Sequence, residues 1–225
     1  GRDKNKTIRL KLYKATKSGD NFWTDVKELP FNSNDYSTAH PALSTDNKRL
    51  YFASDRPGTF GMSDIWYVDI LEDDTYGDPV NLGPSINTEA REGFPFISEM
   101  NNLYFSSDGH SGLGGLDILT APLKEDGKAG KVTNLGEPAN SKKDDFAFII
   151  EESKRIGYLS SNRDGSQGSV SDDIYRVQEK CEITIEGLVT NKDTGELLPG
   201  ATVMLLDENN EQIASVTADE NGKYN

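Results

Sequence analysis

Six aspartates recur in the same local setting along the chain and are the residues whose spacing most suggests site chemistry. Three follow an apolar segment and enter a glycine-containing turn, and three open the next apolar segment; the pairs are Asp55 and Asp64, Asp108 and Asp117, and Asp164 and Asp173. Clustered carboxylates suit Ca²⁺, but residues 108–117 and 164–173 do not fit the twelve-residue calcium loop that ends in Glu. An Asp in such a turn also accepts hydrogen bonds from backbone N–H groups. Because the pair recurs, we interpret it as a structural repeat motif without a metal; calcium binding is the alternative.

Catalytic residues are not predicted. The chain has no Gly-x-Ser-x-Gly nucleophile motif. Its two histidines, His40 and His110, occupy comparable regions of the repeat and lack the spacing of a metal-binding pair. The single cysteine, Cys181, forms no intrachain disulfide and completes no zinc site. We therefore predict a non-enzymatic protein without a cofactor, with a glycosidase carboxylate pair as an alternative because 38 Asp and Glu residues are present.

A group of large aromatic residues could mark a binding face. The candidates are Tyr51, Phe60, Trp66, Tyr76 and Tyr104. Strand alternation places about half of such residues inside a sheet stack, where aromatic packing is ordinary. A packing role is therefore the main interpretation, and a binding face is the alternative.

Charge and hydropathy limit the partners. The net charge is -14 and the isoelectric point is about 4.6, so repulsion from phosphates disfavours nucleic acid and anionic membrane surfaces. No run of 18 apolar residues is present, and we expect no direct membrane insertion. The 21 glycines and 9 prolines suit a protein with many turns.

The apolar segments around the aspartates repeat with a period of 53 residues. Phe52, Phe105 and Tyr158 are spaced 53 apart, as are Leu29, Leu82 and Leu135. A period of this length indicates a repeat architecture. Each repeat contains four strand-like segments separated by turn residues, which is typical of an antiparallel propeller blade. In the first, for example, residues 41–44 precede strands near residues 50–54 and 64–68 and an outer strand that ends in Asn-Leu-Gly.

The predicted fold class is all-β: a partial β-propeller followed by a truncated, prealbumin-like β-sandwich. Residues 1–179 form three to four blades of four strands, with an N-terminal blade represented only by strands at residues 7–16 and 22–30. The third repeat is predicted to lack its outer strand. Residues 182–225 alternate apolar and polar side chains in strands near residues 183–189, 202–206 and 213–217, and are expected to be a sandwich that is incomplete at its C-terminal end.

The repeats resemble TolB-like and WD-repeat-like β-propellers. The phrase Pro-x-Leu-Ser-x-Asp, then Leu-x-Phe-x-Ser-Asp-Arg-x-Gly, then Asp-Ile-Trp, occurs in residues 41–58 with 64–66. Residues 95–109 with 117–118 and residues 147–165 with 173–175 are similar to it, the last with one extra residue in the turn. Residues 183–224 resemble the carboxypeptidase-regulatory-like sandwich through Thr194-Gly195-Glu196, Pro199-Gly200-Ala201 and Asp219-x-x-Gly222-x-Tyr224.

The order of the two domains is similar to that of envelope proteins of Bacteroidetes-type bacteria. These include lipoproteins of the outer-membrane-protein-A family and periplasmic components of type IX secretion and gliding. The resemblance implies a periplasmic, outer-membrane-associated scaffold that binds other envelope proteins and reaches peptidoglycan only through a module outside this chain. Two alternatives are a glycan-binding module of a polysaccharide-utilisation or cell-wall protein and the substrate-gating propeller of a peptidase whose catalytic domain lies elsewhere.

Overall fold

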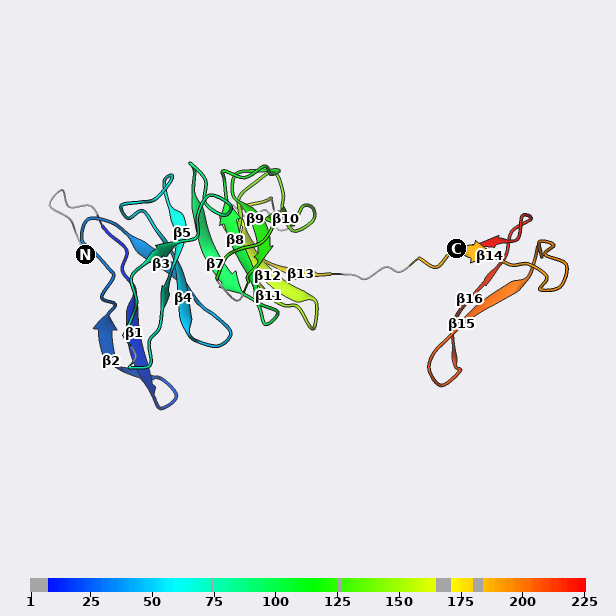
Figure 1. The fold of residues 1–225 in the computed structure, drawn as a ribbon, viewed down its shortest axis with the longest axis horizontal. Coiled ribbons are helices and arrows are strands. Elements are labelled where there is room, and N and C mark those ends of the chain that lie inside the picture. The colour runs from blue at the N-terminus through cyan, green and yellow to red at the C-terminus, as the bar shows by residue number, and fades with distance from the viewer. Residues whose placement is uncertain (1–7, 74, 125–126, 165–170, 180–183) are drawn as a thin grey trace. The chain divides into compact units, whose positions relative to one another are not determined.

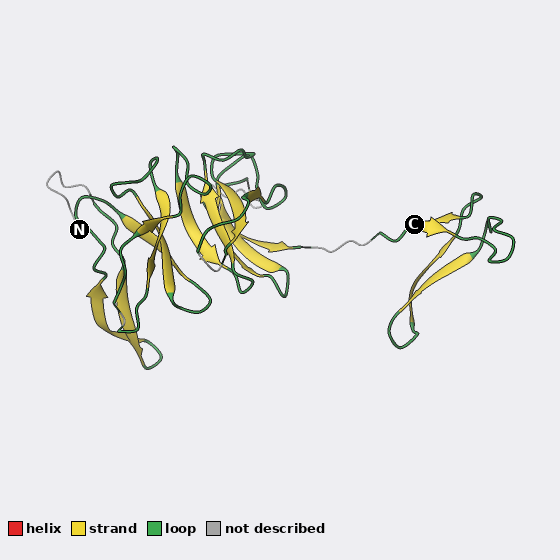
Figure 2. Ribbon diagram, viewed as in Figure 1, coloured by secondary structure: helices red, strands yellow, loops and turns green. Residues whose placement is uncertain are grey.

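A computed structural model describes residues 8–73, 75–124, 127–164, 171–179 and 184–225. All regular secondary structure in these residues is β-strand (Figure 2). The chain divides into two compact units, Gly1–Glu179 and Lys180–Asn225, which are described separately. None of the described segments is a helix of the length and apolarity needed to cross a membrane.

The first unit is a series of antiparallel sheets that follow one another along the chain (Figure 1). A hairpin is followed by two four-stranded sheets and one three-stranded sheet. The strands are β1 (Tyr13–Ser18) and β2 (Phe22–Glu28); β3 (Thr38–Leu43), β4 (Arg49–Ser54), β5 (Asp64–Asp69) and β6 (Val80–Asn81); β7 (Glu92–Ile97), β8 (Asn102–Ser107), β9 (Asp117–Pro122) and β10 (Thr133–Asn134); and β11 (Asp145–Glu151), β12 (Ile156–Ser161) and β13 (Asp173–Gln178). The partial propeller is confirmed, and among the described residues the third repeat has three strands without an outer strand.

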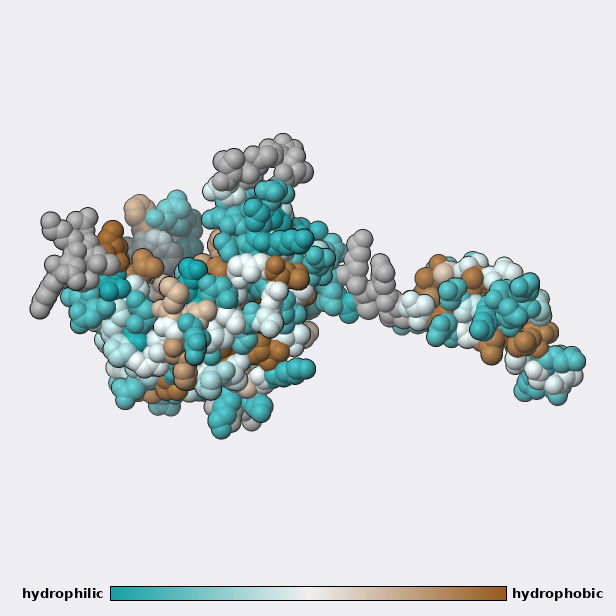
Figure 3. Space-filling model, turned by 90° about the horizontal axis from the view of Figure 1, so that it is seen from above, coloured by the Kyte–Doolittle hydropathy of each residue, from teal (hydrophilic) through white to brown (hydrophobic). Residues whose placement is uncertain are grey.

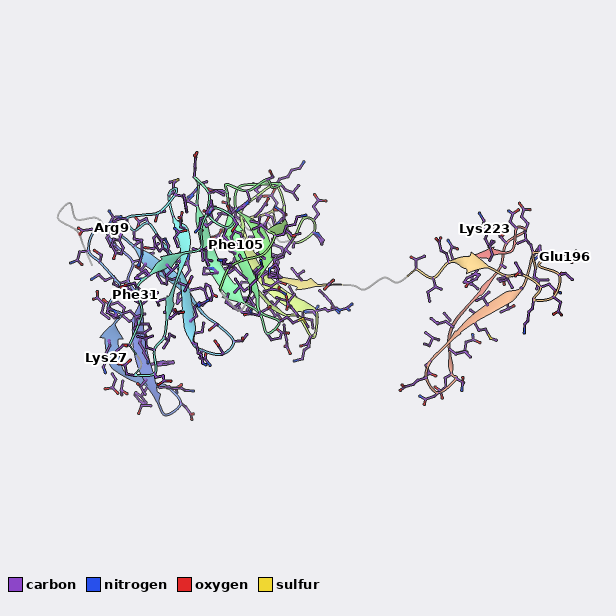
Figure 4. The ribbon with its side chains drawn as sticks, viewed as in Figure 1. Arg9, Lys27, Phe31, Phe105, Glu196 and Lys223 are labelled. Carbon is purple, nitrogen blue, oxygen red and sulfur yellow. The ribbon has the colours of Figure 1, made fainter. Side chains whose placement is uncertain are left out.

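Both faces of the second strands of the first two repeats, β4 and β8, are buried, which explains their continuous apolar runs in the sequence. In β4, Leu50 and Phe52 pack with residues of the β1–β2 hairpin region, including Phe31. Tyr51 and Ala53, on the opposite face of β4, pack against the next sheet. Figure 4 shows Phe31 beside the hairpin and Phe105 within the repeats. Full burial of each large side chain contributes about 1.5–3 kcal/mol, so the cores between sheets hold the repeats together.

The 53-residue spacing that placed Tyr158 as the equivalent of Phe52 and Phe105 is wrong by one residue in the third repeat. Ser54, Ser107 and Ser161 are the ladder partners of Asp64, Asp117 and Asp173. Counting back from these serines, the third-repeat equivalent of Phe52 and Phe105 is Leu159, which is buried, and not Tyr158. The first hairpin of the second repeat is one residue shorter than the others, because Glu92 pairs with Ser107 whereas Thr38 pairs with Ser54. A shift of one residue moves a side chain to the other face of its strand.

The N-terminal hairpin begins later than predicted. Strand β1 starts at Tyr13, whereas the alternating pattern indicated residues 7–16. Leu12 is held instead by Asn32 and Leu29: its N–H donates to Asn32 Oδ1 at 3.0 Å, and its carbonyl accepts from Leu29 N at 3.1 Å. Leu12 is therefore tied to the segment after β2 although it lies outside β1.

The second unit contains two short antiparallel sheets. Strand β14 (Gly187–Leu188) pairs with β17 (Lys223–Tyr224), and β15 (Thr202–Leu206) pairs with β16 (Gln212–Thr217). The strand expected near residues 183–189 is limited to its last part, and Cys181 lies outside the described residues. Hydrophobic side chains remain on the surface of this unit (Figure 3), among them Met204 and Ile213, which are 56% and 63% exposed. Its likeness to a carboxypeptidase-regulatory-like sandwich stays a prediction.

Candidate functional site

The aspartates that follow the second strand of a repeat fasten the loop in front of the first strand. Asp55 Oδ1 accepts a hydrogen bond from Ser37 N at 2.5 Å, and Asp108 Oδ1 accepts one from Arg91 N at 2.7 Å. In the third repeat the same bond runs from Asp144 N to Asn162 Oδ1 at 2.8 Å. Asn162 therefore occupies this position, and the predicted Asp164 lies two residues further on with an exposed side chain.

The aspartates that open the third strand hold the preceding turn and the outer strand. Asp64 Oδ2 accepts from Phe60 N at 2.9 Å and from Asn81 Nδ2 at 2.6 Å. Asp117 Oδ2 accepts from Leu113 N at 2.5 Å and from Asn134 Nδ2 at 3.2 Å. Asp173 opens β13, the last strand of its sheet, and is half-buried. These bonds fasten the turns before β5 and β9 in the first two repeats, and the structural role of the six aspartates as one motif stays a prediction.

No set of three or more His, Cys, Asp or Glu side chains in the described part of the chain is arranged to hold a metal ion. The buried Oδ1 atoms of Asp64 and Asp117 have no hydrogen-bond partner among the described residues. A single carboxylate oxygen is far short of the six to eight oxygen ligands that Ca²⁺ takes.

A set of asparagines that sequence reasoning missed connects each sheet to the next. Asn87 Oδ1 accepts from Ile65 N at 2.8 Å, and its Nδ2 donates to Ile65 O at 3.0 Å. Asn140 makes the same pair of bonds to Ile118, at 2.8 and 2.9 Å. The sequence contains a signal for these asparagines, because two segments share Asn-Leu-Gly and a second Asn at the same spacing. Residues 80–88 read Val-Asn-Leu-Gly-Pro-Ser-Ile-Asn-Thr, and residues 133–141 read Thr-Asn-Leu-Gly-Glu-Pro-Ala-Asn-Ser.

The arginine of the repeated motif is buried in the first repeat. Arg56 is 5% exposed, and its guanidinium lies 4.7 Å from the ring centre of Phe52 and 5.4 Å from that of Trp66. It donates to Phe31 O at 3.2 Å. Burial lowers the pKa of Arg56. In the second repeat His110 takes this role, with its Nε2 2.8 Å from Ile86 O.

The first strand of each of the three sheets carries the same backbone irregularity, and this feature forms the candidate site. Each of β3, β7 and β11 has a bulge, and its central residue has a positive φ: 51° at His40, 52° at Phe94 and 54° at Ala147. Residues other than glycine rarely adopt this conformation, which costs about 1–3 kcal/mol and is concentrated at functional sites. Its recurrence in three repeats makes it a designed feature of the fold.

Aromatic rings from the three strands form a row at these bulges. The rings of His40 and Phe94 stack with centroids 3.8 Å apart, and Phe94 lies 5.0 Å from Phe146. Phe94 N donates to His40 Nδ1 at 3.2 Å, so the histidine is neutral at this nitrogen. Burial lowers the pKa of His40, which favours the same neutral form.

Beside this row lies a groove of about 310 Å³ that crosses β3, β7 and β11. Its lining is mainly aliphatic and aromatic, and His40 is its only titratable side chain. Leu43 and Ile149 line it while each remains 49% exposed. The groove is therefore suited to holding apolar side chains and offers no pair of acid and base groups.

The aromatic residues proposed from the sequence are mostly part of the packing. Tyr51, Trp66 and Tyr104 are buried at 2%, 7% and 8% exposure, and Tyr76 is half-buried. Phe60 is 51% exposed and stays a surface residue. The two histidines are not in comparable places: His40 lies in β3, whereas His110 lies in the turn after β8. The sequence carried a signal of this difference, because the 70 residues from His40 to His110 are not a multiple of the 53-residue period.

No protein-family model matches the chain, and no curated protein is similar to it. Solved structures that are similar include a protein assigned as TolB from Agrobacterium tumefaciens, with 15% identity, a TM-score of 0.42, and 88% of this chain and 60% of that chain covered. A puromycin-hydrolysing peptidase of Mycobacterium tuberculosis has 14% identity and a TM-score of 0.46, with 86% and 33% covered. A prolyl endopeptidase has 14% identity and a TM-score of 0.43, with 89% and 26% covered. The chain thus spans less than two thirds of each of these proteins, and the likeness is one of fold.

Proposed function

We propose that this chain is a non-enzymatic scaffold that binds other proteins through its propeller repeats, with the groove across β3, β7 and β11 as a contact surface. The observation that carries the proposal is the repeated bulge, because it places equivalent apolar residues of three repeats along one groove. Leu43 and Ile149 are half-exposed there. Apolar side chains held on a rigid sheet surface bind a partner with little loss of conformational freedom.

The proposed setting is the bacterial cell envelope, in the periplasm and associated with the outer membrane. The sequence resemblance to envelope proteins of Bacteroidetes-type bacteria supports this setting, and a secretion or gliding machine is the proposed context. Other envelope proteins are the proposed partners, and peptidoglycan is reached only through a module outside this chain. The net charge of -14 disfavours nucleic acid.

The glycan-binding alternative is less well supported. Sugar rings stack on the free faces of aromatic side chains, but Tyr51, Trp66 and Tyr104 are buried between sheets. The peptidase-gating alternative depends on a catalytic domain that would have to lie outside this chain. The exposed aromatic residues of the described chain, such as Phe22 and Trp23 in β2, lie outside the repeated groove that carries the protein-binding proposal.

Site-specific crosslinking tests the proposal. A photoreactive amino acid at Leu43 or Ile149, in envelope extract of the organism that encodes the protein, is expected to capture the same protein from both positions. Phe22 in β2, which is 72% exposed, is the control position outside the groove. Capture should fall when Phe94→Ala removes the central ring. Equal capture from Phe22, or selective strong binding on a glycan array without protein capture, would argue against the scaffold role.

A further inference from the structure

The third repeat ends in a sheet edge and a face that the described residues leave uncovered. Ile65 and Ile118, which follow the opening Asp of the third strand in the first two repeats, are each 0% exposed. The same position in the third repeat is Ile174, which is 79% exposed. Tyr104 is 8% exposed, whereas its equivalent Tyr158 is 43% exposed. In the part of the chain that the structure describes, β13 is the last strand of its sheet (Figure 1).

The first two repeats show what covers the equivalent edge. In each, the nine-residue outer segment, 80–88 or 133–141, runs along the third strand. Its first part is the short strand β6 or β10, which pairs with β5 or β9. The leucine that follows donates its N–H to the buried isoleucine: Leu82 to Ile65 O at 3.2 Å, and Leu135 to Ile118 O at 3.1 Å.

The two asparagines of the segment add side-chain contacts. The first bonds the opening aspartate, as Asn81 does with Asp64. The second bonds both backbone groups of the isoleucine, as Asn87 does with Ile65. The two asparagines also bond to each other, with Asn87 Nδ2 2.8 Å from Asn81 Oδ1, and Asn140 and Asn134 repeat this bond at 2.8 Å. In these two repeats the contacts thus involve both asparagines, which are six residues apart.

The third repeat retains the aspartate and the isoleucine to which the outer segment binds in the first two repeats. Asp173 and Ile174 pair with Ser161 and Ser160 in β12, in the register of the first two repeats. We propose that the outer edge of β13 binds a segment of a partner protein with the pattern x-Asn-Leu-Gly-x-x-Φ-Asn-Ser/Thr, where Φ is apolar. The segment adds to the sheet as a fourth strand, a mode in which backbone bonds give affinity and side-chain contacts give specificity. This inference rests on the proposed role as a protein-binding scaffold but uses a surface other than the groove.

A synthetic peptide with the sequence of residues 78–90 tests the inference on the whole chain. Titration calorimetry is expected to show saturable binding at one site, and backbone hydrogen exchange is expected to slow in residues 173–178. Substituting the peptide asparagine that corresponds to Asn81 or Asn87 by Ala should weaken binding about tenfold or more, because each removes hydrogen bonds to groups that become buried.

Variants of the protein locate the site. Ile174→Glu places a charge at the proposed contact and should abolish binding, and Asp173→Ala should weaken it. Val26→Glu is the matched control, because Val26 is 64% exposed in β2, away from this edge. Absence of peptide binding, with crosslinks from the groove still present, would overturn this inference and leave the proposed function standing. Binding that ignores both asparagines, or concentration-dependent dimers that Ile174→Glu disrupts, would also overturn it.

Discussion

Asn87 satisfies both backbone hydrogen-bonding groups of Ile65, a buried residue 22 positions earlier in the chain. Asn140 does the same for Ile118, also at a separation of 22. In each case the amide comes from the loop leading into one sheet, and the isoleucine lies in the third strand of the preceding sheet. A single side chain therefore ties the loop that leads into one sheet to the third strand of the preceding sheet.

Replacing this amide should destabilise the first unit. Asn87→Ala leaves Ile65 N without a partner inside the fold, and each unsatisfied buried group costs about 1–3 kcal/mol. We expect the free energy of unfolding to fall by about 2–4 kcal/mol in urea titrations followed by the fluorescence of Trp66, which is 7% exposed. Asn21→Ala, in the exposed turn between β1 and β2, should change it by less than about 0.5 kcal/mol. Equal effects would contradict the role of Asn87.

The buried guanidinium of Arg56 gives a second prediction. Arg56→Lys keeps a cation but loses the planar group that reaches Ser54, Thr38 and Phe31. The free energy of unfolding should fall by about 1–3 kcal/mol. Arg91→Lys is the control. The Arg91 side chain is 59% exposed in its ion pair with Asp108, and exposed ion pairs contribute about 0–1 kcal/mol to stability. A loss at Arg91 as large as that at Arg56 would contradict the importance of burial.

His40 should make stability depend on pH. Burial lowers its pKa below the ordinary value of 6.5, so the unfolded chain binds a proton more readily than the folded one. Stability is therefore complete above about pH 6.5 and falls as pH decreases toward the lowered pKa, by about 1.4 kcal/mol for each unit of depression. Urea titrations between pH 7 and 5 should show this slope, and His40→Gln should reduce it. An unchanged slope in His40→Gln would assign the effect to other groups.

The positive φ of Ala147 predicts a stabilising substitution. Glycine adopts this conformation without steric cost, so Ala147→Gly should raise the free energy of unfolding by about 0.5–1 kcal/mol. The matched control is Ala42→Gly, which lies in β3 and does not have a positive φ. That change should lower the free energy by a similar amount, because glycine has more freedom to lose. The two variants should thus shift the thermal midpoint in opposite directions.

The sequence predicted the features that depend on local pattern. The 53-residue period, the four-stranded sheets of the first two repeats and the three-stranded third repeat all follow from alternating apolar residues and turn residues. These patterns are local because each strand is short and its turn lies within a few residues. The nine-residue segments at 80–88 and 133–141 were also readable as a repeat, although their role depends on residues 22 positions earlier.

The sequence by itself was enough to predict an acidic, all-β repeat protein, and it contains no evident catalytic motif. Only the tertiary structure decided which aromatic residues are buried, that Asn162 replaces Asp164 in its turn, and that Leu159 rather than Tyr158 faces the core. It also decided that His40, Phe94 and Phe146, more than 50 residues apart in sequence, stack in one row. The physical reason is register: one residue more or less in a hairpin reverses the face of every side chain that follows, and only the paired strands show where that change occurs.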